Sequence, residues 1–214
     1  MKWSIVFSIL ALFIASCSKE GSNPVEPINA QEKVTDYYPM GVGNYWIYEY
    51  YTSDSTLNFI DQNIIDSVYV EKDSICNGNV YAVVCSSYWS GQTLIRDSSD
   101  YLVTNTGKKI FTIAKDTSNF IDRYYPYPDN VYHETWKMKE SDSTCSVPSG
   151  QYVAKYLLGT VTSSIPISPL RSRRSYYYAY VKSVGKVYER LGYVNYPEYI
   201  EERLIRYHIN GKTM

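Results

Sequence analysis

The stretch that decides the fold spans residues 68–89 and reads VYVEKDSICNGNVYAVVCSSYW. Two runs rich in valine and tyrosine, at 68–70 and 80–89, flank the dipeptide Asn77-Gly78. Asn-Gly readily takes the positive φ angles of a type I′ turn, and the twist of that turn matches the twist of paired strands. The segment therefore predicts a β-hairpin.

Similar runs continue outward from this hairpin in both directions. They lie at 44–51, 101–103, 110–114, 131–138, 151–158, 175–181 and 186–190. Turn residues separate them, such as Asn105-Thr106-Gly107 and Pro148-Ser149-Gly150. In the first run, Trp46, Tyr48 and Tyr50 would share one face of a strand. The spacing predicts a mostly β fold with little helix, built as a single antiparallel, strongly curved sheet, a sandwich or a half-barrel.

The composition agrees with a globular β domain. The chain has 214 residues, of which 44% are hydrophobic and 20% are charged, so one domain of ordinary size is expected. It contains 25 tyrosines against 5 phenylalanines, and tyrosine suits a half-buried, pleated surface. The formal net charge of −1 provides no basic surface, so we expect no nucleic acid partner.

The first residues are typical of an export signal. Lys2 precedes an apolar run at 5–14 that is shorter than the about 20 residues needed to span a bilayer. The run ends in Ile14-Ala15-Ser16-Cys17, which resembles the lipobox of bacterial lipoprotein precursors. The resemblance implies cleavage between Ser16 and Cys17, a diacylglycerol on the Cys17 sulfur, and an acyl chain on the new amino terminus. The alternative is an ordinary signal peptide that happens to end near a cysteine.

The segment after Cys17 reads as a tether. It contains two prolines, few apolar residues and no periodicity up to about residue 36. Ser18 stands where inner-membrane retention signals usually have aspartate, so we expect the outer membrane, with the periplasmic or the cell-surface side left open. The predicted organisation is a signal peptide at 1–16, a lipidated cysteine and tether at 17–36, and a β domain at 37–214.

The cysteines other than Cys17 do not require a disulfide. Three remain, so at most one bond can form within the chain. In the predicted hairpin, Cys76 lies beside the turn and Cys85 lies well along the second strand, so the two would not face each other. Three reduced cysteines, with Cys145 as the third, are the alternative.

The last segment carries conflicting signals. Asn195, Pro197 and Glu198 are typical of a helix start, and Gly211 would cap the end. Alternation over 203–209 instead indicates a strand. Local signals alone favour the helix slightly.

A resemblance bears on this conflict. Residues 38–48 read YPMGVGNYWIY, which is similar to the opening of a family of uncharacterised bacterial lipoproteins, with Met40 where the family usually has leucine. Later motifs of that family are matched by three stretches of this chain: the turn at 148–152, the aromatic run followed by Val-Gly-x-Val at 176–187, and the pattern Leu204, Tyr207, Ile209. The resemblance implies a closing strand, which we adopt as our prediction, and it implies no activity.

Catalytic and metal motifs are missing from the sequence. The two histidines, His133 and His208, lack the spacing of a zinc protease, and nothing orients Cys145 and His133 as nucleophile and base. Carboxylates are plentiful, but a glycosidase would need two held about 5 to 9.5 Å apart. We therefore expect a protein that is not an enzyme, with no metal and no cofactor beyond the covalent lipid.

One stretch resembles a ligand site in its chemistry. Arg171, Arg173 and Arg174 come just before Tyr176 and Tyr178, and guanidinium groups beside aromatic rings can hold an anionic sugar or a phosphate. The alternative is a solvated loop after two prolines. The aromatic residues Trp46, Tyr48, Tyr50, Trp89 and Trp136 could likewise stack on sugars, although a role in the core is the simpler interpretation.

These features together predict a membrane-anchored envelope lipoprotein that acts as a binding or structural module without catalysis. Its partner would be a glycan, a peptide or another envelope protein, in addition to the membrane that holds the lipid. Two alternatives are a lipid or lipoprotein carrier, in which a half-barrel encloses an apolar cavity, and a cell-envelope hydrolase.

The anchor gives the first testable prediction. Cys17→Ala removes the sulfur that would carry the lipid, so the variant is expected to leave the membrane fraction. Intact mass should show a lipid on a wild-type chain that begins at Cys17. A wild-type protein that is soluble and carries no lipid would contradict the prediction.

Overall fold

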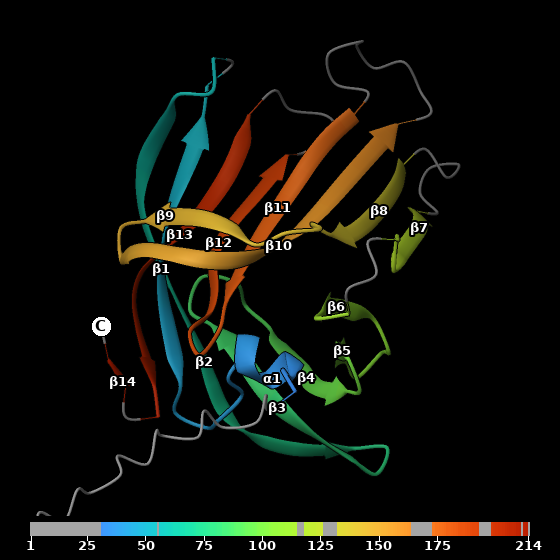
Figure 1. Ribbon diagram of the computed structural model, residues 1–214. Coiled ribbons are helices and arrows are strands. Elements are labelled where there is room, and N and C mark those ends of the chain that lie inside the picture. Colours follow the sequence, from blue (N-terminus) through green and yellow to red (C-terminus); the bar gives the residue numbers. More distant parts are fainter. Residues whose placement is uncertain are drawn as a thin grey trace, which may run out of the picture. The chain divides into compact units, whose positions relative to one another are not determined.

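The computed structural model of the protein (Figure 1) describes residues 31–54, 56–114, 118–125, 132–163, 173–192, 198–210 and 212–213. The folded unit spans Glu32–Met214. Its elements, in chain order, are α1 (Val34–Tyr37), β1 (Tyr45–Ser53), β2 (Phe59–Cys76), β3 (Asn79–Ser86), β4 (Gln92–Ser98), β5 (Tyr101–Thr104), β6 (Lys109–Thr112), β7 (Ile121–Tyr125), β8 (Tyr132–Met138), β9 (Ser143–Val147), β10 (Gly150–Ser163), β11 (Arg173–Val181), β12 (Gly185–Gly192), β13 (Tyr199–Ile209) and β14 (Lys212–Thr213).

The strands form one antiparallel sheet that is nearly closed into a barrel, which confirms the predicted curved sheet with little helix. Its order is β6-β5-β4-β3-β2-β1-β13-β12-β11-β10-β8-β7, with β14 paired to β13 and β9 paired to β10. Phe111 of edge strand β6 packs against Tyr180 of β11, with ring centroids 4.2 Å apart. Since β6 and β11 are far apart in the strand order, this contact requires the sheet to curl back on itself.

The hairpin that decides the fold is present as predicted. β2 and β3 pair from Val68–Ser86 to Cys76–Asn79. Asn77 and Gly78 have φ angles of 50° and 75°, the positive values that a type I′ turn needs.

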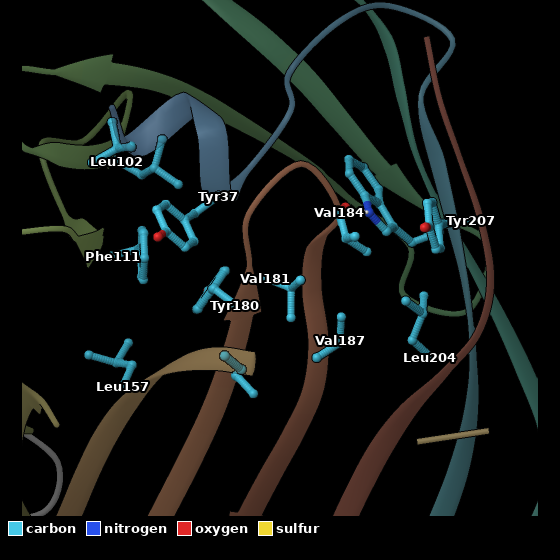
Figure 2. Close-up of a cluster of buried hydrophobic side chains, with 14 of the residues drawn as sticks. Tyr37, Leu102, Phe111, Leu157, Tyr180, Val181, Val184, Val187, Leu204 and Tyr207 are labelled. Carbon is cyan, nitrogen blue, oxygen red and sulfur yellow. Dashed lines mark hydrogen bonds between the residues drawn. The ribbon is translucent and has the colours of Figure 1, made fainter. Parts of the chain in front are cut away.

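Strand β1 lies between β2 and β13. Its buried positions alternate, and Trp46, Tyr48 and Tyr50 are at most 5% exposed, so these three rings belong to the core. The Trp46 indole donates a hydrogen bond of 2.5 Å to the Val184 carbonyl, in the turn between β11 and β12. Figure 2 shows the surrounding core, where Leu102 and Phe111 lie on one side of Tyr180 and Val187 and Leu204 lie on the other.

The closing segment is the strand β13, as the resemblance implied, and not the helix that local signals favour. Tyr45–His208 to Thr52–Ile200 are paired across β1 and β13. Pairing with a buried partner strand overrides the local helix signals, because the paired strand buries Leu204, Tyr207 and Ile209.

The folded unit begins before the predicted boundary at Tyr37. The short helix α1 buries Val34 and Tyr37, and the Ser183 backbone N–H donates to the Asp36 carbonyl at 2.6 Å. The end of the segment predicted as tether therefore packs on the core. Cys17 and most of that segment lie outside the described residues.

Cys76, Cys85 and Cys145 are all free thiols, in line with the expectation that Cys76 and Cys85 do not bond. Among the residues that the structure describes, no helix is long and apolar enough to cross a membrane.

Gly185 provides a test of the core packing around Trp46. A Cβ at Gly185 would lie 2.8 Å from the Trp46 indole nitrogen, and Gly185 has a φ of +111°. Gly185→Ala is therefore expected to lower the free energy of unfolding by roughly 2–4 kcal/mol, from backbone strain and overpacking together.

The control is Gly107→Ala, where φ is +79° but no atom lies within 4 Å of the added Cβ. It should lower the free energy of unfolding by about 1 kcal/mol, from backbone strain alone. Equal losses for the two variants in urea titrations would show that the contact with Trp46 is unimportant.

Candidate functional site

The curved sheet encloses a cavity of about 510 Å³, which we call the inner cavity. Residues of both edge strands line it, namely Lys109 and Ile110 of β6 and Ile121 and Arg123 of β7. The cavity therefore lies where the sheet is not closed by strand pairing. The remaining lining residues are Tyr38, Tyr48, Val68, Thr93, Ile95, Lys108, Glu134, Trp136, Leu157, Tyr176, Tyr178, Tyr180, Lys186, Glu189 and Leu191.

The alternation of strand β11 sends Tyr176, Tyr178 and Tyr180 to the inner cavity. The Trp136 ring stacks on Tyr178 with centroids 4.9 Å apart. Trp136 can lie flat against the sheet because its cross-strand partner is Gly159, where a Cβ would approach the indole to 2.8 Å. These rings form an aromatic wall.

A buried ionic cluster, the inner triad of Lys186, Glu189 and Glu202, lies next to this wall. The Lys186 ammonium donates to Glu189 and, at 2.8 Å, to Glu202. Both carboxylates are only 11% exposed in their side chains. The Tyr50 hydroxyl donates to Glu202 at 2.7 Å, so the cluster is tied into the core.

A β-bulge explains how the inner triad assembles. Residues three apart on a regular strand face opposite sides, so Lys186 and Glu189 should not meet. The register shifts between the pairs Ala179–Tyr188 and Tyr180–Lys186, which leaves Val187 as the extra residue of β12. Because a bulge redirects the side chains that follow it, Lys186 and Glu189 both line the inner cavity.

The inner triad shifts the pKa values of its members. Burial raises the pKa of Glu189 to about 7, although Lys186 acts in the opposite direction. Burial also acts to raise the pKa of Glu202, but the charge of Lys186 and the hydrogen bonds from Lys186 and Tyr50 outweigh it, and the pKa is lowered. Burial alone would lower the pKa of Lys186, and the two carboxylates raise it instead.

A second ion pair lies in the wall of the inner cavity. Arg123 of β7 donates through Nε to Glu134 of β8 at 2.6 Å. The Trp136 indole also donates to Glu134, whose carboxylate is buried. This pair fixes the edge strand β7 against β8 and adds polar groups to the cavity.

The geometry of the inner triad does not favour hydrolysis. A glycosidase needs its scissile bond between two carboxyl groups. The Lys186 ammonium occupies that position between Glu189 and Glu202. Glu201 and Glu202, which are consecutive in β13, cannot share a cleft, because Glu201 pairs with Arg190 on one face of the sheet and Glu202 pairs with Lys186 on the other.

The residues that the sequence predicted as a ligand site are not brought together. Tyr176 and Tyr178 line the inner cavity. Arg173 is exposed, whereas Arg174 is buried with its guanidinium carbon 3.8 Å from the centroid of the Tyr199 ring. Arg171 lies outside the described residues, as do Ser16 and Cys17.

The remaining sequence candidates have other surroundings. His133 pairs with Asp122 at 2.6 Å, and the Cys145 thiol lies beside the Tyr156 hydroxyl. Each therefore has a neighbour other than the one that a nucleophile–base pair of Cys145 and His133 would need. Trp89 was interpreted from the sequence as a core residue. It is instead 59% exposed and lies outside the core. Over the ranges that the structure describes, no group of three or more metal-ligating side chains is found.

The charged members of the inner cavity were not predicted from the sequence. In a regular strand, Glu189 would share a face with Val187 and Leu191. A carboxylate on such an apolar face is unusual, and this could have identified Glu189 as a candidate site residue. No sequence pattern identified Lys186 as a cavity residue, because the bulge decides which face of the sheet its side chain points to.

Comparisons with known proteins assign no family. A search against models of protein families finds no match, and neither does a search of curated proteins. Two solved structures resemble the chain, each with 12% sequence identity and a TM-score of 0.46. One, from Bacteroides fragilis, is described as an exported protein with a YMCC-like fold and aligns over 78% of this chain and 96% of its own. The other, from Parabacteroides distasonis, is described as a lipoprotein and aligns over 83% and 100%.

The raised pKa of Glu189 predicts a pH dependence of stability. Between the ordinary pKa of 4.5 and about 7, the folded protein keeps a proton that the unfolded chain has lost, so stability falls as pH rises through this range. Glu202 titrates below this window, because its pKa is lowered.

The test is Glu189→Gln, which holds this position neutral at every pH. Thermal unfolding of the wild type should lose stability between about pH 5 and pH 8 relative to the variant. Parallel curves for the two proteins would contradict the assignment.

Proposed function

We propose that this chain is a cell-envelope lipoprotein, held in the outer membrane through lipid on Cys17, that binds a neutral glycan in its inner cavity without catalysis. The observation that carries the proposal is the inner cavity with its aromatic wall and buried ionic groups. Its volume of about 510 Å³ falls within the range of small-molecule sites, roughly 300–1,000 Å³.

The anchor part of the proposal rests on the sequence. An apolar run of signal length ends in the lipobox-like Ile14-Ala15-Ser16-Cys17, and a polar, proline-containing segment follows. An anchor of this kind would keep the folded unit at the membrane surface, where envelope glycans are within reach.

The lining of the inner cavity supports a sugar more than a hydrocarbon chain. A sugar presents flat C–H faces to aromatic rings and hydroxyl groups to charged side chains. An acyl chain would instead have to cover Lys186, Glu189, Arg123 and Glu134, and removing charged groups from water without new partners is costly.

A lipid carrier remains the second candidate, because the cavity lies within a curved sheet, as that function requires. Tyr48 lines it, together with aliphatic residues such as Ile95 and Leu157. The two candidates differ in the ligand they predict, so one binding experiment separates them.

The absence of catalysis is proposed from the position of Lys186. Its ammonium is held between the two carboxylates of the inner triad, so no substrate atom can take that place without breaking both ion pairs. A binding role needs no such displacement.

The test uses the full-length protein in phosphatidylcholine vesicles and isothermal titration with neutral gluco-, manno- and xylo-oligosaccharides. One of these series should bind saturably. Tyr176→Ala removes a ring of the aromatic wall and should weaken binding about three- to tenfold.

The matched control is Tyr177→Ala, because Tyr177 is the next residue of β11 and faces away from the inner cavity. Its affinity should equal that of the wild type. Saturable binding of the apolar probe N-phenyl-1-naphthylamine, displaced by a fatty acid and with no sugar bound, would favour the carrier. Binding of neither class would overturn the cavity as a ligand site.

A further inference from the structure

A second depression, which we call the outer groove, lies on the sheet face opposite the inner cavity. It has a volume of about 440 Å³. Strands β11, β12 and β13 form its floor with Tyr177, Tyr188, Arg190, Glu201 and Arg203, and the hairpin of β9 and β10 contributes Thr144, Cys145, Ser146 and Tyr156.

The hairpin that borders the outer groove is held against the sheet. In Figure 1, β9 and the start of β10 cross in front of β12 and β13. The Ser149 backbone N–H donates to the Leu204 carbonyl at 3.0 Å. The groove therefore has a built wall and is more than an exposed sheet face.

The centre of the outer groove is a buried carboxylate with two guanidinium groups. The Glu201 side chain is 1% exposed. Arg190 donates to one oxygen through Nε at 2.7 Å and Nη2 at 2.6 Å, and Arg203 donates to the other at 2.8 Å and 2.6 Å. The Tyr188 hydroxyl also donates to Glu201, so this carboxylate is fully occupied.

This arrangement leaves one positive charge in excess. Each guanidinium directs Nε and Nη2 to Glu201, and among the described residues neither Nη1 has a hydrogen bond or ion pair. The side chains of Arg190 and Arg203 are 28% and 27% exposed. The carboxylate next along the sheet is Glu49, which is paired with Arg203 across β1 and accepts a hydrogen bond from Tyr51. The described residues include no ion pair between Glu49 and either guanidinium.

Aromatic rings hold both guanidinium groups in place. The Arg203 guanidinium carbon lies 4.0 Å from the centroid of the Tyr51 ring, and that of Arg190 lies 5.0 Å from the Phe59 ring. Tyr177 is paired with Arg190 across β11 and β12, and its ring lines the groove beside that side chain. Fixed guanidinium groups next to a ring match an oxyanion attached to a sugar.

We propose that the outer groove is a second ligand site, which binds an acidic sugar with its carboxylate or phosphate on Arg190 and Arg203 and its ring against Tyr177. The site is independent of the inner cavity, because the two share no lining residue.

The experiment is isothermal titration of the full-length protein, in phosphatidylcholine vesicles, with glucuronate, glucose 6-phosphate, glucose and inorganic phosphate. At least one of the two acidic sugars should bind, and the one that binds identifies the oxyanion. Glucose should not bind the outer groove in the same range, and any glucose bound in the inner cavity is recognised by its sensitivity to Tyr176→Ala. Inorganic phosphate should bind at least about threefold more weakly than the acidic sugar, because it lacks the ring.

Arg190→Gln and Arg203→Gln should each weaken binding about tenfold or more, since a charge-assisted hydrogen bond is lost. Arg190→Lys keeps a positive charge beside Glu201 and removes the two-pronged guanidinium geometry, so it tests the same loss without removing one of the two cations that pair with Glu201. Arg206→Gln, at an exposed position of β13, is the control for net charge and should bind as the wild type does.

Tyr177→Ala should weaken binding and Tyr176→Ala should not, the reverse of the pattern expected for the inner cavity. The proposal is overturned if neither acidic sugar binds, if the arginine variants bind as well as the wild type, or if glucose binds equally at a site that Tyr177→Ala weakens. Equal affinity for inorganic phosphate and the acidic sugar would also overturn it, because the ring contact would then contribute nothing.

Discussion

The pairing of β1 with β13 is the interaction on which the rest of the structure depends. In the strand order, β2 to β6 lie on one side of this ladder and β12, β11, β10, β8 and β7 lie on the other. Tyr45 pairs with His208, so the chain must close a very long loop before the sheet becomes continuous. The burial of Trp46 and its hydrogen bond to Val184 fix the same ladder to the β11–β12 turn. This ladder therefore joins the two halves of the sheet whose edge strands, β6 and β7, line the inner cavity.

The parts of the fold that could be predicted from the sequence are those decided by neighbouring residues. Asn77-Gly78 specifies its own turn geometry, and the alternation around Trp46 identifies its buried face. The strand β13 needed more than local signals, because its state is decided by β1, far away in the sequence. The strand order, and the curl of the sheet that brings Phe111 against Tyr180, depend on the same long-range pairing. No periodicity in the sequence predicts that pairing.

The candidate site was harder to predict than the fold for a related reason. Simple alternation assigns Lys186 to the face of Tyr188, and only the bulge at Val187 turns it to the inner cavity. The chemistry proposed for the Arg171–Tyr178 stretch, guanidinium groups beside tyrosine rings, does occur in the structure. It is built from Arg190 and Arg203, which lie on different strands and come together only through sheet register. Spacing along one segment could not identify that pair.

The two ionic clusters share strands β12 and β13 and differ in composition. Glu201 and Glu202 are consecutive in β13 but have different partners. Glu202 shares the Lys186 ammonium with Glu189, whereas Glu201 lies between the guanidinium groups of Arg190 and Arg203. A buried ionic cluster rarely stabilises a fold more than apolar packing would, so a stability role alone does not explain two such clusters in one sheet, and the proposed binding roles would. The outer groove has two guanidinium groups for one carboxylate, which favours an anion, whereas the inner cavity is lined by residues of both charges beside its aromatic wall. Under the two proposals, the two faces of the sheet therefore select different chemical groups: the inner cavity through rings beside mixed charges, and the outer groove through a pair of guanidinium groups.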